Sequence, residues 1–164
     1  MFKLISKTVA AVAIVSVALF GSANAKTLKI ETHFTASSPN GEVAAQFAKN
    51  VEKFSGGSLK VEMFYSSSVT GKSAEVFNSA QTGIIDCDMT GAGYQTGKNA
   101  AFQFAGDVMG GYDNPYQQYE FLNFPGAQEA VDALYNKYGM TLIGWWIPGH
   151  ESLISSRPIP DVAS

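Results

Sequence analysis

The chain has 164 residues, of which 11 are basic and 14 acidic, so its net charge is −3. This balance argues against nucleic acids or anionic membrane surfaces as partners, because both attract basic proteins. A single cysteine, Cys87, excludes an internal disulfide, so stability must come from an ordinary hydrophobic core. We interpret Cys87, which lies in an apolar stretch, as an inert core thiol.

Residues 1–25 have the three parts of a secretory signal peptide. Two lysines form a positive start, residues 9–20 are an apolar run, and Ala23-Asn24-Ala25 is a cleavage site of the A-x-A type. The apolar run is too short to span a bilayer stably, and no later stretch is long and apolar enough to do so. We therefore expect a mature protein that begins at Lys26, resides in the periplasm and does not insert into the membrane.

The residues that follow alternate between the patterns of strands and helices. Apolar residues recur at every second position in the strands and every three to four positions in the helices. Such a β-α-β-α-β order predicts an α/β fold, with a mostly parallel sheet flanked by helices. The predicted elements are a strand over 28–34, a helix that starts at Ser38 and Pro39 and ends before Gly56, a strand over 59–65, a short helix capped by Ser73, and a buried strand over 84–90.

The second half of the chain is more helical. Residues 95–111 are rich in Gly and Phe and are predicted to be mostly loop. Asn114, followed by a proline, is typical of a helix start, and Gly139 is well placed to end a second helix over 126–138. An apolar run over 141–146 then predicts a further buried strand.

The strand over 84–90 leads directly into a glycine-rich bend. The bend, Gly91-Ala92-Gly93, is followed by the aromatic Tyr94. In an open α/β sheet, ligands bind just beyond the carboxyl ends of the strands. The pattern therefore places residues 90–94 at the mouth of a candidate site. It also fits a plain strand-to-loop junction that binds nothing.

Polar and aromatic residues recur at the carboxyl ends of the predicted parallel strands. Aromatic walls with a few polar groups in fixed positions suit a small, partly polar ligand. Each aromatic residue alone is better explained as core, so the hypothesis of a ligand site depends on their convergence. The candidates are His33 and Phe34 after the first strand, Tyr65 after the second, Tyr94 after the third, and Trp146, His150 and Glu151 after the fourth.

Patterns for catalysis or metal binding are weak. Gly91-x-Gly93-x-x-x-Gly97 is one residue away from the dinucleotide fingerprint, and no Gly-x-Ser-x-Gly elbow of a serine hydrolase occurs. The two histidines, His33 and His150, lack the spacing of a zinc site. Asp86 and Asp88 share one face of a strand and are candidates for a carboxylate pair. A solvated edge residue and a cap explain the same two residues as well.

Three groups of residues follow one another in a characteristic order. They are Phe47-Ala48-x-x-Val51-Glu52-x-x-Ser55-Gly56-Gly57-x-Leu59-x-Val61, then Ala80-x-x-Gly83-x-x-Asp86, then Gly144-Trp145-Trp146 continuing to Ser156-Arg157-Pro158-Ile159. This order resembles the solute-binding subunits of tripartite ATP-independent periplasmic (TRAP) transporters, the DctP-type family, over the whole mature chain. Residues 93–102 and His150-Glu151-Ser152 look most like the branch that binds 2-oxo acids and related small monocarboxylates.

The resemblance implies a periplasmic-binding-protein-like fold of two lobes that close on a ligand. Family members are longer, so residues 26–164 are expected to form the N-terminal lobe, with the second lobe largely missing. The family's carboxylate-clamping arginine would lie outside this sequence, as would the ligands of any Na⁺ or Ca²⁺ ion that bridges the substrate. No other cofactor is expected. Tyr94 is then the residue most expected to face the ligand, and Glu151, where sialic-acid-binding members have arginine, argues against sialic acid.

The resemblance also implies a binding protein and not an enzyme. It would capture a small organic acid, a 2-oxo acid or a similar monocarboxylate, and deliver it to the TRAP membrane permease subunits. One alternative is an exported α/β enzyme that acts on a small organic acid, with its catalytic residues either beyond Ser164 or at Asp86, Asp88 and His150. Another is an inactive fragment that exposes apolar surface.

Overall fold

The computed structural model describes residues 25–106, 108, 110–145, 147 and 154–158. Apart from Ala25, the predicted signal peptide lies outside the described residues. Three predicted site residues, Trp146, His150 and Glu151, also lie outside them. None of the helices in the described ranges has the length and apolar character needed to cross a membrane.

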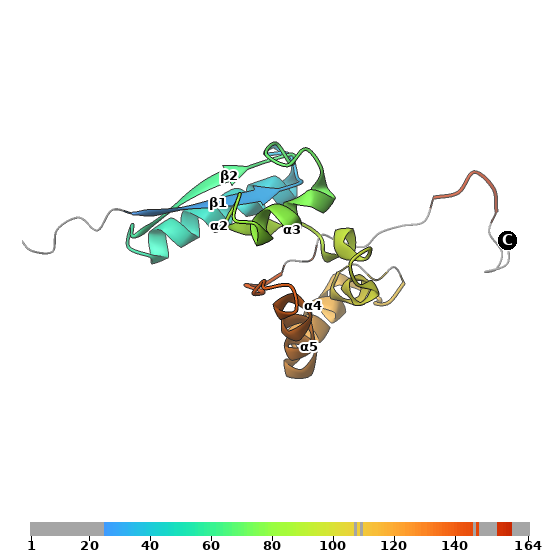
Figure 1. Ribbon diagram of the computed structural model, residues 1–164. Helices are drawn as coiled ribbons and strands as arrows, with labels where there is room; N and C mark the ends of the chain where they lie inside the picture. Colours follow the sequence, from blue (N-terminus) through green and yellow to red (C-terminus); the bar gives the residue numbers. More distant parts are fainter. Residues whose placement is uncertain (1–24, 107, 109, 146, 148–153, 159–164) are drawn as a thin grey trace, which may run out of the picture.

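Three strands form a parallel sheet with the order β2-β1-β3 (Figure 1). They are β1 (Lys26–Thr32), β2 (Leu59–Phe64) and β3 (Cys87–Met89). Ile30 of β1 pairs with Met63 of β2 on one side and with Cys87 of β3 on the other. The predicted β-α-β-α-β order and the parallel sheet are thus confirmed, with β1 as the central strand.

Helix α2 (Pro39–Phe54) connects β1 to β2 and packs against β2. It starts where the sequence predicts, because the Ser38 side chain accepts a hydrogen bond from the Gly41 amide (3.1 Å) and Pro39 lies in the first turn. A larger residue than glycine does not fit at position 41, since its Cβ would collide with the carbonyl oxygen of Thr35. The tight approach of the helix to the preceding turn therefore depends on Gly41.

Helix α3 (Ser73–Gln81) connects β2 to β3, but Ser73 does not cap it as predicted. Lys72 occupies the cap position and makes no side-chain cap bond, while Ser73 is the first helical residue. The Ser73 hydroxyl instead lies 3.4 Å from the hydroxyl of Ser67 in the preceding loop. The conformation of that loop, which depends on contacts distant in sequence, decides where this helix begins.

Strand β3 is shorter than the predicted strand over 84–90. The amides of Ile84 and Ile85 donate to the carbonyl oxygen of Ser79 (2.9 and 3.4 Å), so these two residues end α3 instead of beginning the strand. Ile85 is buried, whereas Ile84 is 57% exposed. The apolar residues Ile84 and Ile85 therefore belong to the end of α3, and the strand begins only at Cys87.

Within the described residues, four helical elements follow β3. They are the 3₁₀ helices η1 (Ala92–Gln95) and η2 (Ala100–Ala105), then α4 (Pro115–Asn123) and α5 (Pro125–Asn136). The segment 95–111, predicted to be mostly loop, thus contains η2. Figure 1 shows α4 and α5 close together, set apart from β1 and β2.

Two local signals in this helical half are confirmed. Asn114 caps α4, since its Oδ1 accepts from two amides in the first turn (3.0 and 3.1 Å). After α5, Gly139 has a φ of 70°, and the Met140 amide donates to the carbonyl oxygen of Tyr135 (3.2 Å). This bond and the left-handed glycine are the features of a Schellman end.

The hydrophobic core joins α3 to η1, η2 and α5. Its buried members are Phe77, Ala92, Phe102 and Leu134, with Tyr135 and Tyr138 packed against them. The rings of Phe77 and Phe102 meet edge to face, with centroids 5.8 Å apart, in a geometry that aromatic pairs favour. The core therefore fixes η1, which carries Tyr94, relative to the sheet-flanking helix α3.

The predicted strand over 141–146 is absent from its described part, residues 141–145. A strand needs a partner backbone to satisfy its amide and carbonyl groups, and β3 pairs over only three residues. Leu142 and Trp145 instead line a pocket together with side chains of α4 and α5, and Ile143 between them is 74% exposed.

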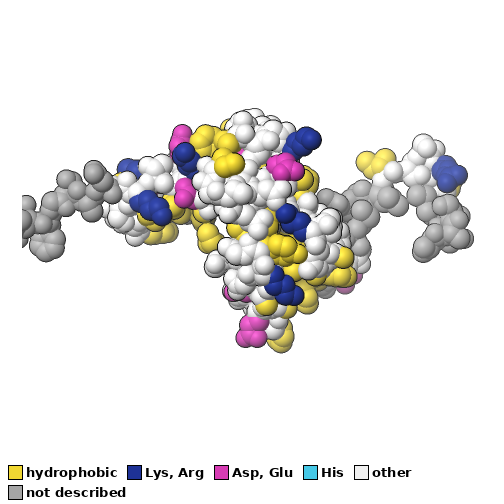
Figure 2. Space-filling model, in the orientation of Figure 1, with side chains coloured by type: hydrophobic (Ala, Val, Ile, Leu, Met, Phe, Trp, Pro, Cys, Tyr) yellow, Lys and Arg dark blue, Asp and Glu magenta, His cyan; other side chains and the backbone are white. Residues whose placement is uncertain are grey.

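Aromatic side chains also face outward on this helical half. Tyr116 is 79% exposed, and Phe124 and Phe104 are exposed as well. Figure 2 shows hydrophobic side chains on the surface in the region that Figure 1 assigns to α4 and α5. The sheet buries the carboxyl end of its central strand, residues 30–32, whereas the helical pair leaves several large apolar side chains exposed.

Candidate ligand-binding site

The candidate site lies where β1 and β3 end side by side. These strands run parallel, and Thr32 at the end of β1 pairs with Met89 at the end of β3. The chain leaves β1 towards β2 on one side and returns to β3 on the other. Such a reversal of strand order is the point at which open α/β sheets bind ligands, outside the carboxyl ends of the strands.

Three of the predicted site residues meet at this point. The ring centroids of His33 and Phe34 are 3.9 Å apart, and those of His33 and Tyr94 are 5.2 Å apart in an edge-to-face arrangement. Tyr94 is 46% exposed, so part of its side chain remains accessible. Tyr65 follows β2, which lies on the other side of β1 from β3. The structure therefore brings together His33, Phe34 and Tyr94.

His33 has a polar atom that the fold leaves unsatisfied. Its Nδ1 is buried and has no hydrogen-bond partner among the described residues. Burial also lowers the pKa of His33 below its ordinary value of 6.5, because a buried ring disfavours the charged form. A neutral imidazole has one donor and one acceptor nitrogen, so His33 can still form a hydrogen bond to a ligand.

The backbone around His33 is held by the loop between β2 and α3 (residues 65–72). The amide of Ser66 donates to the carbonyl oxygen of Phe34 (3.0 Å), and the amide of Ser67 donates to that of Thr32 (3.1 Å). These two carbonyl groups belong to the residues on either side of His33. The position of the His33 ring therefore depends on this loop.

Tyr94 is held by different contacts, within η1 and with α3. Its amide donates to the carbonyl oxygen of Gly91 (3.2 Å) within η1. The neighbouring Gln95 is buried, and its side-chain amide donates to the carbonyl oxygen of Ala74 in α3 (3.3 Å). The site is thus built from two segments that are anchored separately, one after each strand.

Two carboxylates lie side by side in the sheet beneath the site. Glu31 of β1 and Asp88 of β3 are partners in the strand register, and Glu31 is fully buried. Burial, with a smaller contribution from the charge of Glu31, raises the pKa of Asp88 from 3.8 to about 6, against the hydrogen bonds from Thr90, which lower it. Sequence reasoning missed Glu31, because an acidic residue in a strand usually faces water. Its position in a central parallel strand, covered on both faces, was the available signal.

Asp86 has a different environment from Asp88. It is exposed, and its Oδ2 accepts a hydrogen bond from the Lys29 amide (2.8 Å). Asp86 therefore caps a strand amide at the solvated edge, in keeping with the simpler of the two interpretations of this pair. Asp88 has Glu31, and not Asp86, as its partner in the strand register.

Cys87 is half-buried between these acidic residues. Burial raises the pKa of its thiol, and the charges of Asp86 and Asp88 raise it further. A protonated thiol is a poor nucleophile and a poor metal ligand. Among the described residues, no three His, Cys, Asp or Glu side chains are grouped so that they could hold a metal ion.

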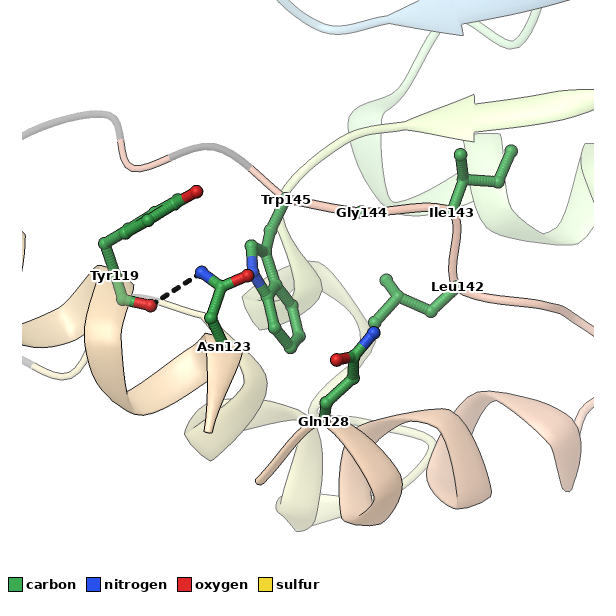
Figure 3. A pocket seen from close by; sticks show the side chains of 7 residues that line it. All are labelled: Tyr119, Asn123, Gln128, Leu142, Ile143, Gly144 and Trp145. Atoms are coloured by element: carbon green, nitrogen blue, oxygen red, sulfur yellow. Dashed lines mark hydrogen bonds between the residues drawn. The ribbon is translucent and has the colours of Figure 1, made fainter. Parts of the chain in front are cut away.

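A separate pocket of about 170 Å³ lies between α4, α5 and the segment after α5 (Figure 3). Figure 3 shows the Trp145 ring pointing between the side chains of Asn123 and Gln128, with the Asn123 amide donating to the carbonyl oxygen of Tyr119 (2.7 Å). None of its lining residues belongs to the segments directly after β1 or β3, which carry His33 and Tyr94. This pocket is therefore distinct from the site at His33 and Tyr94.

Comparison with protein families gives one match over most of the chain. Residues 30–164 match the family model DctP, described as bacterial extracellular solute-binding protein, family 7. No curated protein gives a match.

Solved structures with a similar fold are periplasmic TRAP solute-binding proteins. One from Rhodobacter sphaeroides, in an apo open state, has 26% identity and a TM-score of 0.66, covering 72% of this chain and 37% of its own. One from Rhodoferax ferrireducens, with bound malonate, has 27% identity and a TM-score of 0.61, covering 72% and 38%. One from Pseudoalteromonas atlantica, with bound sodium and pyruvate, has 20% identity and a TM-score of 0.64, covering 71% and 35%. The chain thus spans well under half the length of these proteins.

Proposed function

The chain belongs to the bacterial extracellular solute-binding proteins of family 7, and on that premise we propose that the complete protein captures a small organic acid in the periplasm for a TRAP membrane permease. One observation carries the proposal for this chain. His33, Phe34 and Tyr94 converge at the reversal of strand order, and the Nδ1 of His33 is buried without a partner among the described residues. A buried polar atom without a partner destabilises the fold, and a ligand that hydrogen-bonds to it removes that penalty.

The chemistry of related proteins supports a carboxylate ligand. The Rhodoferax ferrireducens protein binds malonate, the Pseudoalteromonas atlantica protein binds pyruvate with sodium, and a Pseudomonas aeruginosa protein with a TM-score of 0.66 binds L-malate. All three ligands are small acids. We assign the 2-oxo acids and similar monocarboxylates as the first class to test.

Each residue of the site has a separate role in this proposal. Neutral His33 donates to a ligand oxygen or accepts from a ligand hydroxyl group. The rings of Phe34 and Tyr94 form an apolar wall that excludes water and so strengthens that hydrogen bond. Trp146, His150 and Glu151 remain proposed contacts outside the described residues.

The mechanism is a shift in population between open and closed states. A ligand that touches both lobes in the closed state, and only one in the open state, stabilises closure by its differential affinity. The permease would then recognise the closed form. A sodium or calcium ion that bridges the ligand is part of the proposal, since the P. atlantica structure contains both bound sodium and bound pyruvate.

The proposal distinguishes a binding protein from an exported enzyme. The intact processed protein is titrated by calorimetry with pyruvate, malonate and L-malate, each with and without Na⁺ and Ca²⁺, and the recovered ligand is analysed by mass spectrometry. Saturable binding of at least one acid with unchanged ligand is expected. Chemical conversion of the ligand supports the enzyme alternative, and absence of binding to any small carboxylate contradicts the proposal.

A further inference from the structure

Glu31 is an acidic side chain inside the sheet. It lies in the central strand and is 0% exposed, flanked by Ile30 and Thr32, which are also buried. Removing a carboxylate from water is unfavourable unless hydrogen bonds compensate for the lost hydration. The partners of Glu31 therefore indicate why an acid is present at this position.

Those partners belong to the loop between β2 and α3. Oε1 of Glu31 accepts hydrogen bonds from the amides of Val69 (2.6 Å) and Thr70 (3.4 Å). Oε2 is buried and has no partner among the described residues. The Glu31 carboxylate thus binds the loop through one oxygen atom, Oε1.

The same loop contains two strained residues. Ser66 and Ser67 have φ angles of 57° and 51°, a left-handed conformation that non-glycine residues rarely adopt. Each such residue disfavours the folded state, so surrounding contacts must maintain the conformation. The bonds from Glu31 and the bond from the Gly71 amide to the carbonyl oxygen of Ser67 (2.7 Å) are contacts of this kind.

The strained residues are also the ones that contact the candidate site. Their amides donate to the carbonyl oxygens of Phe34 and Thr32, on either side of His33. The loop is therefore hydrogen-bonded to the buried carboxylate at Val69 and Thr70 and, a few residues earlier in the chain, to the carbonyl groups on either side of His33. Glu31 precedes His33 by only two residues in the chain, yet it acts on that residue through the loop.

We propose that Glu31 is a positioning residue for ligand binding, which holds the loop of residues 65–72 from inside the sheet and thereby fixes the backbone on both sides of His33. The inference rests on the proposed function for what His33 binds. Its first half, the attachment of the loop, does not depend on any ligand.

Asp88 of β3 is the neighbour of Glu31 in the sheet. It lies beside Glu31 in the strand register and accepts a hydrogen bond from the Thr90 hydroxyl (2.6 Å), in the segment that leads to Tyr94. Burial raises the pKa of Tyr135 in α5 to about 12, with the charge of Asp88 contributing, and the same charge contributes to the raised pKa of Cys87.

The test compares four forms of the intact processed protein. Glu31→Gln keeps one oxygen to accept from the loop, whereas Glu31→Leu has a similar volume and no acceptor. Val76→Ala in α3, a fully buried position, is the control for general loss of stability. Amide hydrogen exchange at Val69 and Thr70 is measured without ligand, relative to amides of β1, and affinity for pyruvate and malonate is measured by calorimetry.

In Glu31→Leu we expect the amide hydrogens of Val69 and Thr70 to exchange at least tenfold faster, and the affinity for pyruvate or malonate to be at least tenfold weaker. Glu31→Gln should resemble the unmodified protein in both readouts, and Val76→Ala should lose stability without either change. If Glu31→Leu does not fold, Glu31→Asp gives the same test, since it keeps the charge but withdraws the oxygen from the loop.

Three outcomes overturn the inference. Unchanged exchange in Glu31→Leu means that Glu31 does not hold the loop. Faster exchange with unchanged affinity means that the loop does not position the site. Weaker binding in Val76→Ala, equal to that in Glu31→Leu, means that only general stability matters. If the unmodified protein binds neither acid, the proposed function fails at that step, while the exchange data still decide the attachment of the loop.

Discussion

His33 and Tyr94 meet edge to face with ring centroids 5.2 Å apart, although one follows the first strand of the sheet and the other follows the third. The contact exists because β1 and β3 are neighbours in the sheet while β2 lies outside them. Each ring is anchored by a different part of the structure, the loop before α3 for His33 and the core around α3 for Tyr94. A ligand between them would therefore connect two independently held segments.

The partly exposed side chain of Tyr94 is the first feature to test. We predict that Tyr94→Ala weakens carboxylate binding by at least tenfold, which is about 1.4 kcal/mol, because the aromatic wall of the site is lost. Tyr116→Ala is the matched control, since that tyrosine is 79% exposed on α4 and far from the ends of β1 and β3 in the fold. Calorimetric titration of both variants should show weakening in Tyr94→Ala only, and equal affinities would rule out this site.

The unsatisfied nitrogen of His33 predicts opposite effects on stability and on binding. His33→Phe keeps an aromatic ring against Phe34 and Tyr94 but removes the buried polar atom. We expect the free energy of unfolding without ligand to rise by up to about 1 kcal/mol, and the affinity for the acid to fall at least tenfold. Urea denaturation and calorimetry measure the two quantities. A variant that is less stable and binds normally would show that His33 is structural.

Asp88 predicts a dependence of stability on pH. Its pKa is raised from 3.8 to about 6 in the folded protein, mainly by burial. Between these values the folded state retains a proton that the unfolded chain releases, so the free energy of unfolding should fall as pH rises through this window. The expected loss is on the order of 2–3 kcal/mol.

Asp88→Asn isolates this effect from the other acidic residues. Asparagine keeps the Oδ1 that accepts from the Thr90 hydroxyl but does not titrate. Urea denaturation of both proteins at about pH 4 and about pH 7 should give a difference in stability that grows in favour of Asn at the higher pH. An identical pH dependence in the two proteins would show that folding does not raise the pKa of Asp88.

The start of α2 predicts two effects of different size. Ser38→Ala removes the side-chain acceptor for the Gly41 amide and should lower the free energy of unfolding by about 1 kcal/mol. Gly41→Ala should be far more harmful, because its Cβ has no room beside the carbonyl oxygen of Thr35. Ser37→Ala, an exposed neighbour, serves as the control. Thermal unfolding that ranks Gly41→Ala as the mildest of the three would contradict the tight turn.

Local signals in the sequence were reliable where local geometry decides the structure. Ser38 with Pro39, Asn114 and Gly139 all occupy the helix ends that their side chains or conformational freedom favour. The β-α-β-α-β order also followed from periodicity alone. From that order, the sequence placed His33 and Tyr94 at the ends of parallel strands.

Predictions failed where contacts distant in sequence decide the structure. Ser73 was expected to cap α3, but its hydroxyl lies near Ser67 in a loop that Glu31 holds. Ile84 was expected in a strand, yet its amide closes the end of α3. The role of Glu31 depends on a strand register and a strained loop, and neither has a local pattern in the sequence.

The most direct test of the ligand site is a crystal structure of the intact processed protein grown with pyruvate or malonate. We predict density for the acid beyond the ends of β1 and β3, within hydrogen-bond distance of the His33 ring and in contact with Tyr94. Density for the acid only in the pocket lined by Asn123, Gln128 and Trp145, or only at a position remote from His33, would contradict the proposed site.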